Sequence, residues 1–316
     1  MPMLVTGCAG FIGSHLCETL LQRGETVIGI DSITSYYSST LKRRNLTLIQ
    51  GHPKFIFLEA DLVEMDLIPC LEQVDTVFHT AGQPGVRGSW GEQFDVYVRN
   101  NISATQRLLE AIRQTGRAIK IIYSSSSSIY GNSEQFPTPE NALPRPYSPY
   151  GMTKLAGEHL CHLYYSNYQI PYVALRYFTV YGPRQRPDMA FHIFIRSVLR
   201  EEAITILGDG NQTRDFTYVA DIVQGNLLAA EKPVSGEVFN LGGGSRVTLR
   251  EVLSLLQELM GKDFQVEYLP PSKGDVRDTS ADIRRVQEML GYEPRWSLRE
   301  GLERQCQWLQ EVYERG

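Results

Sequence analysis

Three glycines near the N-terminus constrain the fold of this chain more than any other feature. Gly7, Gly10 and Gly13 follow an apolar stretch at residues 3–6 and open a helical pattern that continues to about residue 23. Glycines at this spacing permit a tight turn, bring the backbone close to a pyrophosphate and let the helix pack closely, while the helix N-terminus favours negative charge. The segment therefore predicts a strand, a dinucleotide-binding loop and a helix.

Alternating strand and helix patterns continue downstream of this loop. Helices are predicted at residues 101–114 and 149–168, and strands at residues 26–30, 55–59, 76–79, 120–124 and 172–176. Such alternation predicts a Rossmann-like, doubly wound parallel sheet of the α/β class. Beyond about residue 182, Pro and Gly interrupt shorter elements, one of them a helix near 248–261.

This change of rhythm predicts two domains. Residues 1–178, rejoined by about residues 217–245, are expected to form an NAD-binding domain. Residues 179–316 are expected to form a smaller C-terminal α/β domain that binds the substrate. A chain of 316 residues is long enough for one large core or two adjoining lobes.

Composition and charge exclude several classes of function. The 31 Lys and Arg residues against 36 Asp and Glu residues give a net charge of −5, so no broad basic surface is available for nucleic acid. The five cysteines are scattered without metal-ligand spacing, and His159 with His162 cannot form a metal site alone. We therefore expect reduced thiols, no metal and a cytoplasmic protein. No apolar stretch is long enough to span a membrane, and the apolar N-terminus lacks the basic start of a signal peptide.

Acidic residues follow two predicted strands where a bound dinucleotide would meet them. Asp31 ends the second strand, where a carboxylate can accept hydrogen bonds from both adenine-ribose hydroxyls and would repel a 2′-phosphate. This position favours NAD over NADP, although the nearby Arg43 and Arg44 leave NADP open, and a simple turn residue is the alternative. Asp61 and Leu62 follow the third strand and are placed to meet the adenine.

A tyrosine and a lysine at the start of the predicted helix 149–168 indicate chemistry. Ser148 and Pro149 are a favourable N-cap and first helical residue. Tyr150 and Lys154 then lie four residues apart, on one helix face. A phenol loses its proton near pH ~10, and a close cation favours the phenolate. We therefore predict that Tyr150 takes a proton from a substrate alcohol, as hydride removal from a carbinol requires.

The order of these motifs resembles the extended short-chain dehydrogenase/reductase family, and within it the NAD-dependent sugar-nucleotide epimerase and dehydratase branch. The similarity runs nearly end to end and includes residues 79–82, 129–131 and 208–216. It implies that the C-terminal domain binds a sugar nucleotide. It also implies a homodimer formed through two helices per subunit, those near 101–114 and 149–168.

The resemblance assigns further site residues. It implies Ser126 as the third catalytic residue, whose hydroxyl can bond the reacting oxygen while Lys154 holds the nicotinamide ribose and lowers the phenol pKa. It implies cofactor contacts from Phe11, Ile12, Ala81 and Tyr177 as well. One departure is Gly82, where relatives usually have alanine, a change expected to loosen packing beside the nicotinamide without removing any chemistry.

Ser127 and Ser128 distinguish between the reactions of this branch. Similar dehydratases carry Asp and Glu at these positions, and similar sugar-acid decarboxylases carry Glu at the second. Serine hydroxyls have no useful proton affinity near neutral pH, so elimination is disfavoured. The resemblance therefore implies oxidation at C4, turning of the 4-keto sugar and return of the hydride to its other face, which is 4-epimerisation.

Two segments resemble UDP-glucuronate 4-epimerases, residues 178–190 and 85–87. Related glucose epimerases usually have Asn where Thr179 stands. Thr179 and the serines 126–128 offer hydroxyl donors to a C5 carboxylate, and Arg186 with Arg87 can supply positive charge. The resemblance therefore favours UDP-glucuronate as the substrate and UDP-galacturonate as the product.

Two arginines resemble the residues that hold the UDP ribose and diphosphate in this family. They are Arg214, in the segment 208–216, and Arg277, in the segment 274–278. An arginine fork can bind two phosphate oxygens at once, but an isolated arginine more often forms a surface ion pair. The segment around Arg277 also resembles N-acetylglucosamine-type 4-epimerases, so UDP-glucose and UDP-N-acetylglucosamine remain alternative substrates.

Oxidation of glucuronate at C4 creates a β-keto acid, which loses carbon dioxide when its carboxylate bond lies perpendicular to the carbonyl. We expect Ser127 and Ser128 to hold the carboxylate away from that angle; the alternative is that they only cap the loop. Two rival functions remain, a sugar-nucleotide oxidoreductase with exchangeable NAD(P)H and a non-catalytic NAD-binding regulator. The latter tends to lose the Tyr/Lys pair, which is present here.

Overall fold

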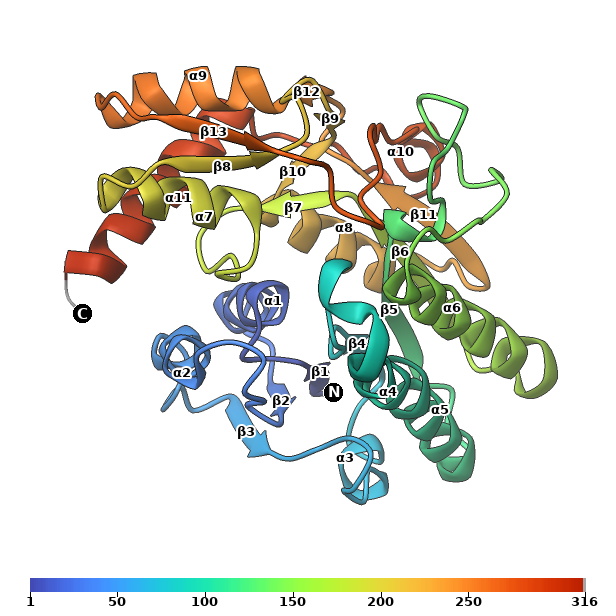
Figure 1. The fold of residues 1–316 in the computed structure, drawn as a ribbon. Coiled ribbons are helices and arrows are strands. Elements are labelled where there is room, and N and C mark those ends of the chain that lie inside the picture. Colours follow the sequence, from blue (N-terminus) through green and yellow to red (C-terminus); the bar gives the residue numbers. More distant parts are fainter. Residues whose placement is uncertain (315–316) are drawn as a thin grey trace.

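A seven-stranded parallel sheet forms the centre of the protein, which a computed structural model describes over residues 1–314 (Figure 1). The strand order is β11-β6-β5-β4-β1-β2-β3, and every neighbouring pair is parallel. The strands are β1 (Met3–Thr6), β2 (Val27–Asp31), β3 (Phe55–Glu59), β4 (Thr76–His79), β5 (Lys120–Ser126), β6 (Tyr172–Tyr177) and β11 (Glu237–Leu241). The predicted doubly wound parallel sheet is confirmed.

Helices cover both faces of this sheet because each crossover between parallel strands must pass over one face. One face packs against α1 (Phe11–Gln22) and α8 (Val219–Glu231), and the other against α3 (Ile68–Leu71), α5 (Ala104–Thr115) and α6 (Pro149–Tyr168). The buried strands are short apolar runs, such as Leu4 and Val5, which are fully buried.

The helix predicted at 101–114 is longer and less regular than expected. It begins with α4 (Phe94–Tyr97), passes through a π-helical segment, Val98–Ser103, and continues as α5. Such π-bulges frequently occur at functional sites. The segment contains Asn101, which lies buried against the loop after β4, where its amide side chain exchanges hydrogen bonds with the backbone of Gln83. The π-helical segment therefore carries a polar contact to Gln83, 18 residues earlier in the chain. Helical periodicity alone cannot predict such a contact.

The remaining elements form smaller sheets and helices beyond the carboxyl ends of the central strands. The described pairs are β7 (Thr179–Tyr181) with β10 (Phe216–Tyr218), β8 (Ile204–Leu207) with β13 (Val266–Leu269), and β9 (Thr213–Arg214) with β12 (Val247–Thr248). The helices there are α7 (Ala190–Leu199), α9 (Leu249–Met260), α10 (Arg284–Leu290) and α11 (Leu298–Glu314). The helix α2 (Ser39–Thr47) instead connects β2 with β3 and packs against α1.

The chain leaves the central sheet after β6 and returns to it with β11, which pairs with β6. Residues after 241 lie outside that sheet. The division into an NAD-binding domain and a sugar-nucleotide domain at residue 178 stays a prediction. Residues 237–241 form β11 and so belong to the same central sheet as the strands of residues 1–178.

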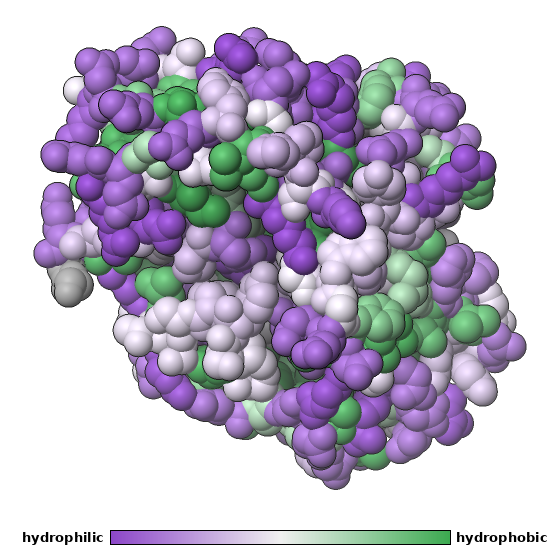
Figure 2. Space-filling model, viewed as in Figure 1, coloured by the Kyte–Doolittle hydropathy of each residue, from purple (hydrophilic) through white to green (hydrophobic). Residues whose placement is uncertain are grey.

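The face in Figure 2 is largely hydrophilic, with apolar residues gathered in a few groups between hydrophilic ones. No helix within residues 1–314 has the length and apolar character needed to cross a bilayer. The same residues contain no cluster of three or more His, Cys, Asp and Glu side chains able to hold a metal ion.

Candidate active site

The sheet order changes direction between β1 and β4, and this switch point locates the main cavity. Strands on its two sides connect in opposite directions, so the loops at their carboxyl ends separate and leave a crevice. The cavity there is lined by residues from the ends of β1, β2, β4 and β5 and from α6. We call it the cofactor cavity; its lining includes the predicted residues Gly7, Gly10, Phe11, Ile12, Gly13, Asp31, Asp61, Leu62, Ala81, Tyr150, Lys154 and Tyr177.

Backbone packing explains the glycines of the first loop. Gly7 has φ +72°, and a Cβ there would lie 2.8 Å from the backbone nitrogen of Ala81. A Cβ on Gly13 would lie 2.1 Å from the carbonyl oxygen of Gly7. The loop therefore folds back on the start of α1, and α1 begins without a side-chain cap. Its first N–H groups thus remain available to a phosphate.

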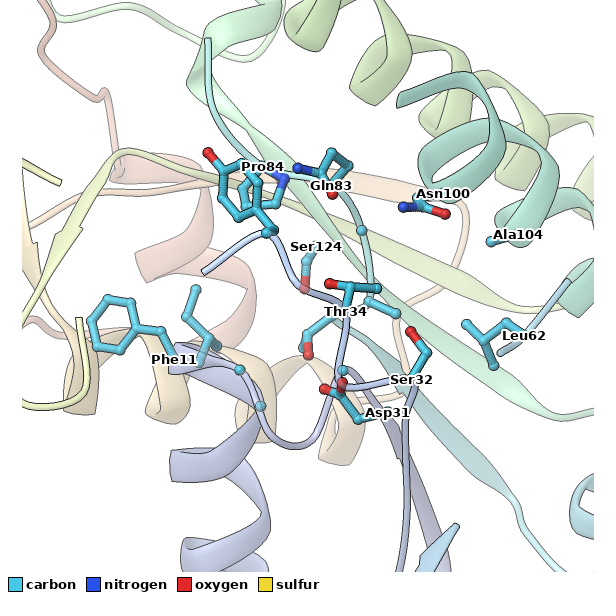
Figure 3. Close-up of a pocket in the computed structure, with 18 of the residues that line it drawn as sticks. Phe11, Asp31, Ser32, Thr34, Leu62, Gln83, Pro84, Asn100, Ala104 and Ser124 are labelled. Carbon is cyan, nitrogen blue, oxygen red and sulfur yellow. The ribbon is translucent and has the colours of Figure 1, made fainter. Parts of the chain in front are cut away.

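Asp31 lies at the floor of the cofactor cavity, near Ser32 and Thr34 (Figure 3). Its two oxygens accept hydrogen bonds from the backbone N–H groups of Ala9, at 3.0 Å, and Ile33, at 2.8 Å. Burial raises the pKa of the carboxyl, while these bonds and the charge of Lys42 act in the opposite direction. Each carboxylate oxygen keeps a lone pair for a ribose hydroxyl.

The nearby basic residues lie differently from the expectation. Arg43 forms a two-pronged ion pair with Glu59, at 3.0 and 2.7 Å, and its side chain is half exposed. Neither Arg43 nor Arg44 lines the cavity. Lys42 does, and its Nζ donates to the carbonyl and hydroxyl oxygens of Thr34. The two arginines that left NADP open are therefore not placed to receive a 2′-phosphate.

Leu62 and Phe11 lie on opposite sides of the cavity, with Asp31 between them (Figure 3). Asp61 is held by Arg99, whose Nη1 lies 2.6 Å from its carboxylate, and it accepts a hydrogen bond from the backbone of Val63. The Asp61 carboxylate thus has both a charged partner and a turn to fix it.

Tyr150 and Lys154 lie in the first two turns of α6, which begins as predicted with Ser148 as its N-cap. The Ser148 hydroxyl accepts a hydrogen bond from the Gly151 N–H at 3.1 Å, and Pro149 is the first helical residue. Both Tyr150 and Lys154 line the cofactor cavity. The Lys154 Nζ donates to the carbonyl oxygen of Ser124, at the end of β5, at 3.0 Å.

The electrostatics of this pair differ from the expectation. Burial raises the pKa of Tyr150, whereas a hydrogen bond with Ser126 and the charge of Arg186 lower it. Burial also lowers the pKa of Lys154 to about 8. The pKa of Tyr150 is raised on balance, and the cation that opposes this rise is Arg186, while the Lys154 ammonium is directed at the Ser124 carbonyl.

Packing against two polar side chains explains why glycine occupies position 82, which the sequence did not reveal. A Cβ at this position would lie 2.8 Å from Oδ1 of Asn101 and 3.2 Å from Nζ of Lys154. The glycine therefore makes room for these two polar groups beside the cavity instead of loosening the packing there. Asn101 uses that room to bond the backbone of Gln83 and, through Nδ2, the hydroxyl of Thr153 at 2.9 Å.

A second cavity adjoins the first at Tyr150, Tyr177 and Arg186, which line both. We call it the substrate cavity. Its lining includes the predicted substrate residues Ser126, Ser127, Ser128, Thr179, Arg186 and Arg214. Ser126 ends β5, and its hydroxyl accepts the backbone N–H of Ser128 at 3.1 Å, which caps the turn Ser127–Ile129.

The four predicted substrate arginines separate into two pairs. Arg186 and Arg214 line the substrate cavity, Arg186 in an ion pair with Asp188 at 3.0 Å, and Arg214 donating to the carbonyl oxygens of Val276 and Arg277. Arg87 instead pairs with Asp275 at 2.7 Å. The side chain of Arg277 is 66% exposed and pairs with Asp209, so the structure does not bring it to the cavity.

The model of the NAD dependent epimerase/dehydratase family matches residues 3–242. The chain belongs to this family. A UDP-glucuronic acid 4-epimerase from Bacillus cereus, solved with UDP-glucuronic acid and NAD, is 45% identical, with a TM-score of 0.96 over 99% of this chain and 100% of that chain.

Of two further relatives of this epimerase/dehydratase, one carries the same sugar name and the other a different one. A UDP-glucuronate 4-epimerase of Thermodesulfobacterium geofontis is 39% identical over 98% of this chain and 97% of its own. A UDP-glucose 4-epimerase of Thermotoga maritima, solved with UDP-glucose, is 38% identical, with a TM-score of 0.90 over 99% of this chain and 100% of that chain.

The cofactor of this family is NAD, and the cofactor cavity fits it. The uncapped start of α1 and the space at Gly7 and Gly13 suit a pyrophosphate. The hydroxyl of Tyr37, which lines the cavity, is buried and has no hydrogen-bond partner among the described residues. A bound polar ligand would satisfy it.

Sequence reasoning missed several residues that line the two cavities. Lys42, Tyr36 and Gln83 line the cofactor cavity, and Tyr147 and Met189 line the substrate cavity. Lys42 lies in the segment where the two arginines had already drawn attention, so its basic character was the one available signal. The others come from loops that reach the site through tertiary contacts, which no local pattern records.

Proposed function

We propose that this epimerase/dehydratase family member interconverts UDP-glucuronate and UDP-galacturonate by NAD-dependent 4-epimerisation through a transient 4-keto sugar. The observation that supports it most is the meeting of the two cavities at Tyr150. One cavity has the features of an NAD site, and the other is lined by Ser126–Ser128, Thr179, Arg186 and Arg214. Hydroxyls and arginines line most of the polar part of the second cavity, and its one acid, Asp275, is paired with Arg87.

The chain's own residues divide the chemistry among themselves in this proposal. Tyr150 takes the proton from the C4 hydroxyl and returns it, while the Ser126 hydroxyl bonds the reacting oxygen. NAD held in the cofactor cavity would supply the acceptor for a hydride from C4 and, once reduced, the donor that returns it to the other face. Arg186 favours the charged phenolate by its position near Tyr150. The first loop and Asp31 hold the dinucleotide, and Lys154 its nicotinamide ribose.

The substrate carboxylate is proposed to bind the hydroxyls of Ser127, Ser128 and Thr179, with Arg186 supplying charge. This arrangement holds the carboxylate away from the angle at which the 4-keto acid would lose carbon dioxide. Arg214, which lines the same cavity, is proposed to hold the UDP diphosphate. Arg87, predicted to supply charge to the carboxylate, would first have to leave Asp275. Arg277, predicted to hold the UDP with Arg214, would first have to leave Asp209.

Proton NMR of the purified protein with UDP-glucuronate and no added NAD tests this function, with UDP-glucose run in parallel. We expect galacturonate to form and the glucose compound to stay unchanged. Turnover of UDP-glucose alone would keep the epimerase chemistry and refute the carboxylate argument. Dependence on added cofactor would favour the oxidoreductase alternative.

A Tyr150→Phe variant tests the role of the phenol, because it keeps the ring and removes only the hydroxyl. Activity should fall by about 1,000-fold, since general acid–base groups contribute on that order. The NAD content of the purified variant should stay equal to that of the wild type. A variant that keeps its activity would remove Tyr150 from the mechanism.

UDP-glucose 4-epimerisation is the second candidate, supported by the 38% identity to the Thermotoga maritima enzyme solved with UDP-glucose. Position 179 separates the two candidates, because related glucose epimerases usually carry Asn there. A Thr179→Asn variant should shift the ratio of kcat/KM values towards UDP-glucose if the carboxylate argument holds.

We also propose a cytoplasmic homodimer formed through α5 and α6. Two apolar side chains of α6 are exposed, Met152 at 40% and Leu163 at 53%. Pairing with the same helices of a second copy would cover them. Light scattering coupled to size-exclusion chromatography measures the mass directly, and a mass of one chain of 35.8 kDa would refute the dimer.

A further inference from the structure

The serine turn of the substrate cavity, residues 126–128, is fixed at both ends to one buried ion pair. The pair consists of Glu158, on α6, and Arg176, on β6, whose side chains are 5% and 7% exposed. Arg176 bonds both carboxylate oxygens, Nε to Oε1 at 2.9 Å and Nη2 to Oε2 at 2.8 Å. Such two-pronged geometry fixes both side chains in direction as well as in distance.

One end of the turn is held through Ser125, which directly precedes it. The Ser125 hydroxyl donates to Oε1 of Glu158. Ser125 is buried and lines both cavities. The position at which β5 ends and the turn begins is therefore fixed to the carboxylate of Glu158.

The other end is held through Tyr130, which is separated from the serine turn only by Ile129. Nη1 of Arg176 donates to the Tyr130 hydroxyl at 2.7 Å, and that hydroxyl donates to Oδ1 of Asn240, on β11, at 2.7 Å. Nη1 of Arg176 also donates to the carbonyl oxygen of Glu140 at 2.8 Å. The exit of the turn is thus fixed to the same ion pair as its entry.

The middle of the turn lies directly against the catalytic helix. A Cβ on Gly151 would lie 2.4 Å from the carbonyl oxygen of Ser128. Glu158 lies on the same helix, eight residues after Tyr150 and four after Lys154, so the three side chains recur along one helix face. A single helix therefore carries the proposed proton acceptor and the acid that positions the turn.

We propose that Glu158 and Arg176 are positioning residues that set the serine turn at a fixed place relative to Tyr150. They touch neither cavity, so they act through Ser125 and Tyr130. This inference rests on the proposed function in so far as the turn is what holds the sugar carboxylate. Without the anchor the turn can move, and the carboxylate of the 4-keto acid can reach the angle for decarboxylation. That step breaks the C5–C6 bond, releases carbon dioxide and leaves its electron pair at C5, where a solvent proton adds. Return to C4 of the hydride removed in the oxidation, with a proton to the C4 oxygen, then gives UDP-pentose.

Glu158→Gln is the sharpest test, because glutamine keeps the shape and one acceptor but loses the charge. We expect turnover of UDP-glucuronate to fall about tenfold, less than the about 100-fold that a displacement of a full ångström costs, and UDP-pentose to appear in the NMR spectrum. Tyr130→Phe, which releases only the exit of the turn, should give the same second product with a smaller loss of rate. A product spectrum without pentose in both variants would overturn the inference.

A stability-matched control separates positioning from general destabilisation. Leu256, on α9, is buried far from the turn, and Leu256→Ala should lower stability while keeping the wild-type product ratio. Breaking a buried ion pair is itself strongly destabilising, so rates alone would not suffice. The product ratio does not depend on the fraction of folded protein.

Amide hydrogen exchange of the NAD-loaded protein gives a readout that does not depend on the substrate. Peptides that cover residues 124–131 should exchange faster in Glu158→Gln than in Leu256→Ala at equal stability. Unchanged exchange in this segment would overturn the inference whatever the substrate is. If the wild type does not convert UDP-glucuronate, the proposed function fails, and the exchange result still decides whether the ion pair anchors the turn.

Discussion

The cofactor cavity takes its shape from backbone, whereas the substrate cavity takes its shape from side chains that need partners. Around the pyrophosphate position, Gly7 and Gly13 leave no room for a Cβ, and α1 offers uncapped N–H groups. Around the sugar position, the serine turn and Arg214 are held by groups from distant segments, and Arg186 is held by Asp188, two residues further along the chain. Substitutions that add side-chain volume should therefore damage the cofactor cavity most. Substitutions that remove a hydrogen-bond or ion-pair partner should damage the substrate cavity most.

Gly13→Ala should have the largest effect, because its Cβ would lie 2.1 Å from the Gly7 carbonyl oxygen and would push the loop away from α1. We expect a loss of activity of about 100-fold, the cost of displacing a binding group by about an ångström. The purified variant should also contain much less NAD, measured after denaturation by absorbance and chromatography.

Gly116→Ala is the control for this change. Gly116 ends α5 with φ +67°, and nothing lies within 4 Å of its Cβ position. The variant should therefore lose some stability through backbone strain and keep its NAD. Equal NAD contents in Gly13→Ala and Gly116→Ala would contradict the claim that the backbone packing of the first loop shapes the cofactor cavity.

Arg214→Lys should produce the next largest effect. The guanidinium reaches the carbonyl oxygens of Val276 and Arg277, at 2.7 Å each, and a single ammonium cannot reproduce this fork. Loss of one charge-assisted bond corresponds to about a tenfold rise in KM for the UDP-sugar. Steady-state kinetics should show kcat almost unchanged and the NAD content at the wild-type level.

Asp215 gives a pH-dependent test of the same region. Its carboxylate accepts the backbone N–H groups of Gly243, at 2.7 Å, and Ala281, at 3.0 Å, and burial raises its pKa to about 6. A carboxyl with a raised pKa in the folded state binds its proton more tightly there. Its contribution to stability is therefore greatest below the unfolded pKa of 3.8 and falls as pH rises to about 6.

Asp215→Asn removes this titration. Between pH 4 and pH 6, the free energy of unfolding of the wild type should fall relative to the variant by at most about 1.4 kcal/mol per pH unit, the value for one proton. Denaturant unfolding at several pH values measures the difference. Parallel curves for the two proteins would mean that the burial of Asp215 does not shift its pKa.

Arg277→Ala should have the smallest effect, and it compares the sequence with the structure directly. The exposed pair of Arg277 with Asp209 predicts a change in KM of less than about twofold. If Arg277 leaves Asp209 to hold the UDP diphosphate, as the family resemblance implied, the change would approach that of Arg214→Lys. The ratio of the two KM effects therefore decides where Arg277 lies during turnover.

The cofactor side was predictable from the sequence because its information is local. The glycines after β1 and the Asp at the end of β2 all lie within fewer than 30 consecutive residues, from Met3 to Asp31. Their spacing can therefore be recognised in the sequence alone. The start of α6 was predictable for the same reason, since the N-cap Ser148 and Pro149 are neighbours of Tyr150.

The substrate side was less predictable because its partners lie far apart in the chain. Arg176 meets Tyr130 across 46 positions, and Arg87 meets Asp275 across 188. The space that Gly82 leaves for Asn101 depends on a π-helical segment, and helical periodicity sees that segment as ordinary helix. A spacing pattern identifies which residues matter there, but not which of them face the cavity.

The return of the chain to β6 has a consequence for how the protein is made. On the ribosome, β6 is complete at Tyr177, but its partner β11 begins only at Glu237. Synthesis of the intervening residues takes several seconds. During this time α6 is already complete, and the free edge of β6 presents unpaired N–H and C=O groups. The nascent chain is therefore most prone to pair wrongly with other strands in this interval, and a stalled chain that ends near residue 230 is the species we expect chaperones to recognise.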